Sequence, residues 1–291
     1  MQLLTLVGPV LFVLSADPAP AEERVDPSPH RSDSVVVNEL TLQYLDWGGS
    51  GEPLLLLAGL FGSAHGFDDL APQLTSDFRV LALTRRGHGK SGRPASGYSL
   101  AVLVDDICGF LDLMKIERVH QKWATRLSTN PLTRNRLPFP PAQACVSFSA
   151  FRDWYVREIG PWSPAVEADN REIYLAPDGS VNRYPAPLTI AQEVIASGMA
   201  APPGYAAVKA RALAIFTIPT RAEVPDDADA ELRHRAQEFH DKVLVPMQRE
   251  QIDALRKSRT NVTIVELTGT THMRFMTARE REIVEAMKEL S

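Results

Sequence analysis

The stretch Pro53–Ser91, PLLLLAGLFGSAHGFDDLAPQLTSDFRVLALTRRGHGKS, decides how the chain is expected to fold. It contains two short and almost wholly apolar runs, Pro53–Leu60 and Phe78–Leu83. Such runs are typical of strands that a parallel sheet buries on both faces. Between them, the apolar residues of Phe67–Leu74 are spaced for a short crossover helix. The stretch therefore predicts a strand–helix–strand unit of a parallel sheet.

A glycine-rich loop follows each predicted strand, Ala58–Gly62 after the first and Arg85–Ser91 after the second. Glycines let the backbone turn sharply and expose N–H groups where a side chain would otherwise stand. Because parallel strands end at the same edge of a sheet, both loops border the crevice in which open α/β sheets bind ligands. We therefore predict the functional site at this edge.

The order of these parts resembles the first half of α/β-hydrolases: a strand, an Ala-Gly-Leu60 loop, a helix, a strand, and then Arg86-Gly-x-Gly-x-Ser91. The resemblance extends from about Val35 to the C-terminus. It implies an α/β-hydrolase-like, mostly parallel sheet flanked by helices, with a helical cap insertion. It also implies hydrolysis of ester-like small substrates by Ser-His-acid catalysis, with the N–H of Leu60 as half of the oxyanion hole.

The segment in which this family carries its nucleophile departs from the pattern. The resemblance implies an apolar strand that ends in Gly-x-Ser-x-Gly, the elbow that carries the serine. The chain instead continues Gln121-Lys-Trp-Ala-Thr-Arg-Leu-Ser-Thr-Asn-Pro, and no glycine lies between Gly109 and Gly160. Lys122 in the middle of a buried strand would need costly desolvation. We therefore expect an incomplete central sheet without a nucleophile elbow.

The general base implied by the resemblance is His272, in the loop after the predicted last strand, Asn261–Leu267. A histidine there can take a serine proton only if a carboxylate fixes its tautomer. The alternative is a loop histidine that is hydrogen-bonded to the backbone.

The acid of the triad is expected in the loop after the predicted strand Leu213–Pro219. Asp226 is the preferred candidate there, although aspartates that precede a helix also favour its N-terminal dipole without any catalytic role. The family can instead place this acid after an earlier strand. The other candidates in the loop are Glu223 and Asp227.

Three hydroxyls, of Ser63, Ser91 and Ser128, are placed near the predicted site, and none is assigned as the nucleophile. Ser63 and Ser91 belong to glycine-rich loops, where hydroxyls more often brace the turn. Ser128 is followed by Thr129-Asn-Pro, which disfavours the helix that would support the second oxyanion donor.

No cofactor or metal motif is recognised in the chain. Gly87–Gly92 matches G-x-G-x-x-G, but Pro94 follows it and no helix opens there, so a dinucleotide site is not expected. Ser99 lies in a near match to the elbow pattern and is interpreted as a helix N-cap. There is no His-Glu-x-x-His motif and no paired cysteine motif for a metal.

The remaining chain predicts further regular elements. Two antiparallel strands are expected to meet near Asn38-Glu39. A long helical region from about Asp227 to Ser258 is expected to be interrupted at Pro246. The other predicted helices are Ser99–Lys115, a helix after the N-cap Ser147 that ends at Gly160, Leu188–Met199, and Ala278–Leu290.

The composition is that of an ordinary globular chain, with 291 residues, 44% hydrophobic and 23% charged. This length suffices for one large domain with an insertion. The net charge of −5 does not favour nucleic acid as a partner, so a small-molecule substrate or ligand is expected. Cys108 is expected to be a small buried hydrophobe, with a Cys108–Cys145 bridge as the alternative.

The first 33 residues are predicted to lie outside the folded core. Leu3–Leu14 is an apolar run too short to span a bilayer, and small residues near Ala21 suit signal-peptidase cleavage. We expect residues 1–21 to be a signal peptide and 22–33 a linker. The mature protein would then be exported, periplasmic or secreted, without a stable membrane span. The alternative is a disordered tail on a cytoplasmic protein.

The domain organisation follows from these elements. Residues 34–125 are predicted to form the N-terminal half of the hydrolase core, 126–210 a cap insertion, and 211–291 the C-terminal half. The resemblance implies a hydrolase, but without an elbow we expect the chain to be catalytically impaired. The alternatives are a non-catalytic binding protein on this scaffold and an active hydrolase with an unrecognised nucleophile.

Overall fold

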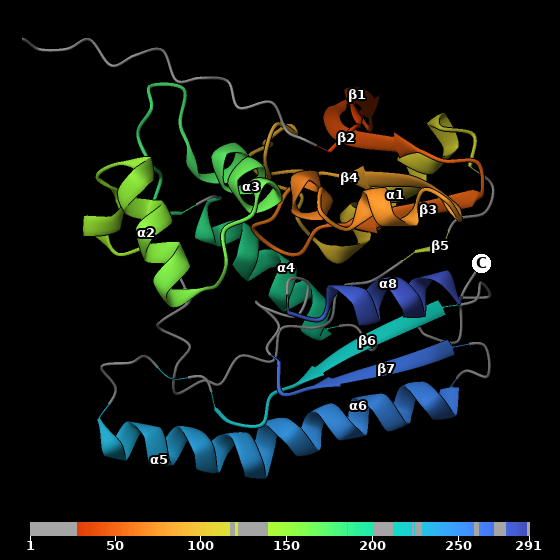
Figure 1. Cartoon of the computed structure of the whole chain (residues 1–291). Coiled ribbons are helices and arrows are strands. Elements are labelled where there is room, and N and C mark those ends of the chain that lie inside the picture. The colour runs from red at the N-terminus through yellow and green to blue at the C-terminus, as the bar shows by residue number, and fades with distance from the viewer. Residues whose placement is uncertain are drawn as a thin grey trace, which may run out of the picture.

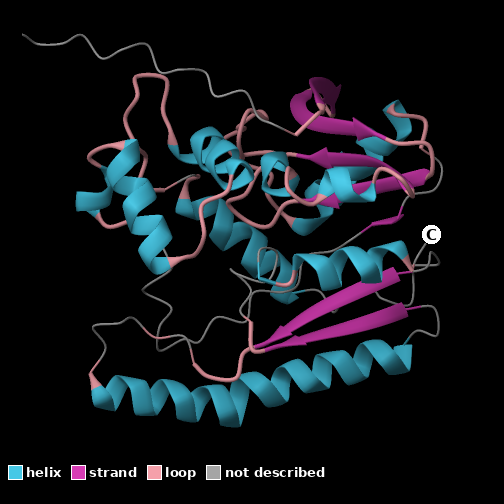
Figure 2. Ribbon diagram, in the orientation of Figure 1, coloured by secondary structure: helices cyan, strands magenta, loops and turns pink. Residues whose placement is uncertain are grey.

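The structure, a computed structural model, describes residues 28–116, 120–121, 139–184, 186–200, 212–222, 224, 229–258, 262–270 and 278–289. In these residues the strands form a five-stranded sheet of order β1-β2-β4-β3-β5 and a two-stranded sheet of β6 and β7. Helices flank both sheets (Figures 1 and 2). The predicted sheets flanked by helices are therefore present in the described residues.

The first sheet begins with an antiparallel hairpin of β1 (Arg31–Val37) and β2 (Leu40–Gly48). The two residues between the strands, Asn38 and Glu39, have positive φ angles of 50° and 63°. A two-residue turn of this kind matches the right-handed twist of the strands that it joins. The predicted meeting point of the two strands is therefore confirmed.

The parallel part of this sheet consists of β3 (Glu52–Leu57) and β4 (Phe78–Leu83), as predicted, with both faces buried. The expected crossover helix between them is wrong. Two 3₁₀ turns, η1 (Ala64–Phe67) and η2 (Ala71–Leu74), stand in its place. Pro72 lacks the N–H that a continuous α-helix would need at this point, and short tight turns do not need it.

The strand that follows β3 in the sheet is only two residues long. This strand, β5 (His120–Gln121), pairs in parallel with β3. The next strands, β6 (Ala212–Ile218) and β7 (Val262–Thr268), pair in parallel with each other and form the separate second sheet. The sequence predicted one parallel sheet that is incomplete at its centre. The described strands form two separate sheets instead.

The helices begin where the sequence predicts capping residues. The Ser99 Oγ accepts the Val102 N–H at 3.5 Å, and the Ser147 Oγ accepts the Ala150 N–H at 3.1 Å, which confirms both N-caps. The helices are α1 (Leu100–Leu113), η4 (Ala142–Cys145), α2 (Phe148–Glu158), α3 (Pro164–Tyr174), α4 (Leu188–Ala200), α5 (Ala230–Phe239), α6 (Val245–Ser258) and α8 (Glu280–Lys288).

A π-helical turn, η6 (His240–Leu244), joins α5 to α6 directly before Pro246. Proline has no N–H to donate to the carbonyl four residues earlier, so the regular α-helical ladder is broken there. Figure 1 shows α5 and α6 as one long rod beneath β6 and β7. The predicted interruption at Pro246 is confirmed.

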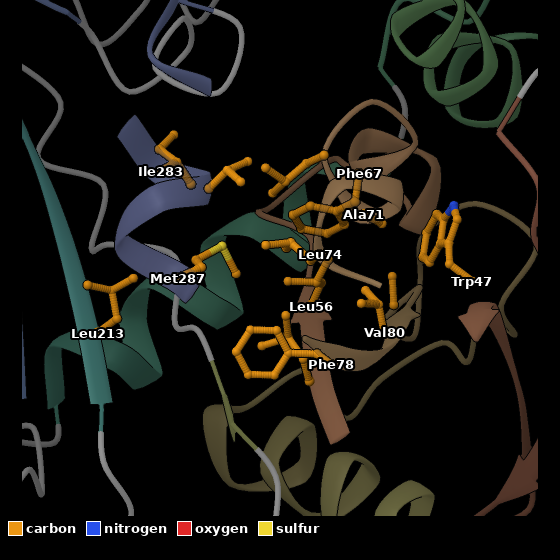
Figure 3. Packing of buried hydrophobic residues seen from close by; sticks show 14 of the residues in the cluster. Trp47, Leu56, Phe67, Ala71, Leu74, Phe78, Val80, Leu213, Ile283 and Met287 are labelled. Atoms are coloured by element: carbon orange, nitrogen blue, oxygen red, sulfur yellow. The ribbon is translucent and has the colours of Figure 1, made fainter. Parts of the chain in front are cut away.

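One apolar core holds the two sheets together. Its cluster joins Leu56 of β3, Leu74 of η2 and Leu213 of β6 to Met287 of α8. Figure 3 shows the α8 side chains facing this cluster. Burial of each large side chain stabilises the fold by about 1.5–3 kcal/mol. The contact between the two sheets thus depends on α8 packing rather than on strand pairing.

The cysteine prediction needs correction. Cys108 is exposed, and it and Cys145 are both free thiols. On α1, Ile107 and Phe110 face the core, and Cys108 falls on the outer side of the helix between them.

No helix in the part of the chain that the structure describes is long and apolar enough to cross a membrane. The predicted signal peptide and the first half of the predicted linker, residues 22–27, lie outside the described residues. The end of that linker, Arg31–Asp33, is not a linker but the start of β1, paired with β2. Export and the domain boundaries therefore stay predictions.

Candidate active-site region

The loop after β3, Ala58–Gly62, contains one tight turn. The Gly62 N–H donates to the Gly59 carbonyl at 3.2 Å, and Phe61 has a positive φ of 69°. Such a φ costs a non-glycine residue about 1–3 kcal/mol, and residues of this kind cluster at functional sites. Among the described residues, no acceptor binds the N–H of Leu60. That N–H is therefore available for the predicted oxyanion role, which stays a prediction.

Ser63 and Ser91, two of the hydroxyls considered as nucleophiles, are buried and hydrogen-bonded. The Ser63 Oγ donates to Asp169 at 2.7 Å and accepts the His65 N–H at 3.3 Å. The Ser91 Oγ donates to the Thr84 carbonyl at 2.6 Å and accepts a backbone N–H of β2 at 2.9 Å. Their exposed fractions are 0% and 3%. Both hydroxyls brace turns, as expected.

Two carboxylates of α3 contact the glycine-rich loops. Asp169 accepts the Ser63 N–H at 2.9 Å in addition to the Ser63 hydroxyl. Glu172 accepts from a side-chain amide of β2 at 2.9 Å and lies 3.4 Å from the His65 Nε2. The Lys90 ammonium lies 3.9 Å from Glu172. These polar contacts fix α3 against both loops.

Apolar side chains cover the loop after β3. The Phe61 ring lies 5.3 Å from that of Phe139 and 6.3 Å from that of His88, centroid to centroid. The contact between Phe61 and His88 brings the two glycine-rich loops together. Phe61 also packs against the cluster of Tyr98, Ala186 and Ile190.

Arg85 and His88 carry buried polar atoms at the same edge of the sheet. The Nε and Nη2 atoms of Arg85 and the Nε2 atom of His88 have no hydrogen-bond partner among the described residues. Burial lowers the pKa of Arg85 to about 10. Burial, together with the charge of Arg85, lowers the pKa of His88 to about 4. At neutral pH a buried cation therefore lies beside a neutral imidazole, an environment that favours a small anion.

Asp169 is expected to make stability depend on pH. Burial raises the pKa of Asp169 to about 6, although the hydrogen bonds from Ser63 act in the opposite direction. An unfolded aspartate titrates near about 3.9. Between these values the folded state binds more protons, so the contribution of Asp169 to the free energy of unfolding falls as pH rises from about 4 to about 6.

We therefore expect Asp169→Asn to gain stability relative to the wild type as the pH is raised through this window. Urea unfolding of both proteins at several pH values measures the difference. Asp153→Asn, on the exposed face of α2, is the matched control and should show no such trend. A difference between Asp169→Asn and wild type that stays constant with pH would contradict the prediction.

The predicted base His272 and the predicted acid Asp226 lie outside the described residues. The strands before them are described: β6 and β7 run parallel, and the Gly269 N–H donates to the Ile218 carbonyl at 3.0 Å. The two loops that carry the predicted acid and base therefore start side by side. The other candidates that lie outside the described residues are Glu223, Asp227 and Ser128.

Sequence reasoning missed Asp169, Glu172 and Arg85. The first two stand three residues apart, a spacing that places them on one face of a helix. This was the only signal for them, since nothing in the sequence indicates which loops that face would contact. Arg85 lies in a recognised loop, but its burial depends on the packing around it.

Comparison with known proteins shows which fold the chain has. A sequence model of the family described as alpha/beta hydrolase fold matches residues 52–123. The crystal structure of E-2-(acetamidomethylene)succinate hydrolase aligns with a TM-score of 0.62 at 18% identity, covering 90% of this chain and 99% of that chain. The chain has the α/β-hydrolase fold. The predicted resemblance is thereby confirmed.

Other structures with the α/β-hydrolase fold agree. One, described as a putative lipase from Acinetobacter baumannii, aligns with a TM-score of 0.56 at 16% identity, covering 90% of this chain and 92% of that chain. At such identities the likeness shows the fold alone.

Curated relatives match this α/β-hydrolase-fold chain over shorter segments. A 2-(acetamidomethylene)succinate hydrolase of Mesorhizobium japonicum is 35% identical over 63 residues, 22% of this chain and 23% of the relative. A haloalkane dehalogenase of the same organism is 31% identical over 104 residues, 35% of this chain and 33% of the relative. The chain thus matches about a quarter to a third of the length of each relative.

Proposed function

We propose that this α/β-hydrolase-fold protein is a member of a hydrolase family that itself hydrolyses esters poorly or not at all. The region beside β3 carries the proposal. In this fold a strand there ends in the elbow that presents the serine. Of this strand, β5, the structure describes His120–Gln121, and the sequence has no glycine from there to Gly160. A sharp strand-to-helix elbow depends on such glycines.

The hydroxyls that could replace the missing serine do not support catalysis. Ser63 and Ser91 are buried and donate to fixed acceptors, so neither can approach an acyl carbon. A nucleophile needs an adjacent base within about 3 Å that takes its proton. The Asp169 carboxylate beside Ser63 is held by α3, and Ser63 itself is fully buried, so its hydroxyl is not exposed to a substrate from solvent.

Labelling with a fluorophosphonate probe tests the proposal. The probe forms a covalent bond with any activated serine, and intact-mass spectrometry counts the adducts. We expect no adduct on the purified chain. Stoichiometric labelling that His272→Ala abolishes would overturn the proposal and would identify a working nucleophile. His234→Ala, on the exposed face of α5, is the matched histidine control and should leave the number of adducts unchanged.

A second candidate function is the binding of a small anionic ligand, such as a carboxylate, without turnover. The buried Arg85, whose Nε and Nη2 lack partners among the described residues, favours it. A buried guanidinium is stabilised by a carboxylate that binds it through two hydrogen bonds.

Titration with succinate, followed by calorimetry, tests this second function. We expect binding that weakens about tenfold or more in Arg85→Ala, because a hydrogen bond to a charged group contributes about 1.5–3 kcal/mol. Arg93→Ala is the matched control in the same part of the chain. Equal affinities for wild type and Arg85→Ala, or no binding at all, would exclude this function.

A further inference from the structure

Two imidazoles and a carboxylate lie together beside the glycine-rich loops. His30 directly precedes β1, His65 lies within η1, and Asp68 is the residue at the C-terminal end of η1. One ligand atom from each side chain lies within 4.8 Å of the others. We propose that these three side chains bind a divalent transition-metal ion, for which Zn²⁺ is the best match.

The donor set and its spacing suit zinc. Imidazole nitrogen and carboxylate oxygen bind Zn²⁺ at about 2.0–2.2 Å in a tetrahedron, so ligand atoms stand about 3.4 Å apart. The His65 Nδ1 and the Asp68 Oδ2 are 2.7 Å apart, and the His30 Nδ1 and the Asp68 Oδ1 are 3.8 Å apart. The two separations involve different oxygens of Asp68, so the carboxylate would bind the ion through both oxygens or turn to present one of them. The His30 Nδ1, which lies 3.3 Å from the Ser28 Oγ, would exchange that contact for the ion.

The surroundings of the three ligands are largely closed to water. Their side chains are 8%, 12% and 1% exposed for His30, His65 and Asp68 respectively. The Trp47 ring lies 5.4 Å from the His30 ring, and the two imidazoles are also 5.4 Å apart, centroid to centroid. Such limited exposure reduces competition from solvent for the ligand atoms.

The second nitrogen of His65 provides the strongest argument. Its Nε2 lies 3.4 Å from the Glu172 carboxylate, while its Nδ1 faces the Asp68 carboxylate. A neutral imidazole carries one proton and can satisfy only one of the two carboxylates. A cation at Nδ1 would leave Nε2–H facing Glu172. This is the carboxylate–histidine–metal arrangement that orients ligands in zinc proteins.

Charge also favours a cation here. Asp68 and Glu172 flank His65. A third carboxylate, Asp169, accepts a hydrogen bond from Ser63, whose hydroxyl in turn accepts the backbone N–H of His65. These three carboxylates are drawn together in a poorly hydrated region, where a divalent ion would offset their mutual repulsion. A metal bound to His30 and His65 would also fasten the chain before β1 to η1, next to the loop that carries Leu60.

Zinc titration of the full chain, with any affinity tag removed and the protein first treated with chelator, tests the proposal. We expect one Zn²⁺ per chain by calorimetry, with a dissociation constant in the micromolar range or below. At about a hundredfold excess over that constant, mass action should raise the melting temperature by about 5 °C or more. Affinity should fall below about pH 6, as the imidazoles take up protons.

Variants separate the ligands from their neighbours. His65→Ala and His30→Ala should each weaken zinc binding about a hundredfold or more, and Glu172→Gln by about tenfold or more. If His65→Ala does not fold, the zinc affinity of His30→Ala tests the proposal instead. His30 lies before the first strand, where a substitution is expected to disturb folding less. His234→Ala, at an exposed position of α5, should bind zinc as the wild type does. No zinc binding by the wild type, or equal affinity in His30→Ala, would overturn the proposal.

Discussion

The purified chain is expected to hydrolyse p-nitrophenyl acetate no faster than buffer. Removal of the serine of a catalytic triad alone lowers the turnover rate by about 10⁶ in the measured hydrolase case. A chain without the elbow, as proposed, would lack a second feature as well, because the N–H after the nucleophile is one of the two oxyanion donors. The N–H of Leu60 could supply only the other donor. A single oxyanion-hole N–H has nothing to stabilise when no nucleophile attacks the ester carbonyl, because no oxyanion then forms.

Spectrophotometric release of p-nitrophenol, measured at several protein concentrations, checks this result. The His272→Ala variant is the control, since a protein without working catalysis should show the same rate with or without this histidine. Release that rises in proportion to protein concentration and falls in His272→Ala would contradict the prediction. It would also show that residues outside the described part of the chain complete an active site.

Replacement of Arg86 by alanine is expected to lower the free energy of unfolding by about 3–5 kcal/mol. Arg86 is buried, and its guanidinium binds both carboxylate oxygens of Asp106 on α1, with a distance of 2.7 Å from Nη2 to Oδ1. It also donates to the Gly97 carbonyl at 2.9 Å. Without Arg86, the Asp106 carboxylate would stay buried with only the Asn38 amide, 3.1 Å away, as a donor.

Urea unfolding of wild type and variants measures this effect. Arg281→Ala provides the matched control, because Arg281 is 89% exposed and its ion pair with Glu285 should contribute less than about 1 kcal/mol. The double variant Arg86→Met with Asp106→Leu should recover much of the loss, since a buried ion pair can be replaced by apolar side chains. Equal losses for Arg86→Ala and Arg281→Ala would contradict the prediction.

Elements with a strong local signal were predicted well from the sequence. The bounds of β4 match the apolar run Phe78–Leu83, and the hairpin turn at Asn38-Glu39 has the backbone geometry expected of it. The Ser99 and Ser147 caps were found for the same reason. In each case the residues that determine the structure stand within a few positions of one another, so the pattern can be read along the chain.

Where the local signal was ambiguous, packing decided. Phe67–Leu74 has the apolar spacing of a helix, yet it forms two 3₁₀ turns against β4, because Pro72 interrupts the helical hydrogen bonds. Cys108 lies within an apolar pattern, yet it faces outward. One residue along a helix rotates the side chain by about 100°, so burial follows from which face meets the sheet.

The sequence by itself determined the fold, the two glycine-rich loops with Leu60, and the absence of a Gly-x-Ser-x-Gly pattern between Gly109 and Gly160. Only the tertiary structure showed that Asp169 binds Ser63, 106 positions away in the chain, and that Glu172 faces His65. It likewise brought His30 to Asp68. Contacts of this kind have no sequence pattern, because they form only when separate elements pack together and bury their polar groups. Each buried polar group then requires a hydrogen-bond partner, and only the folded chain supplies it.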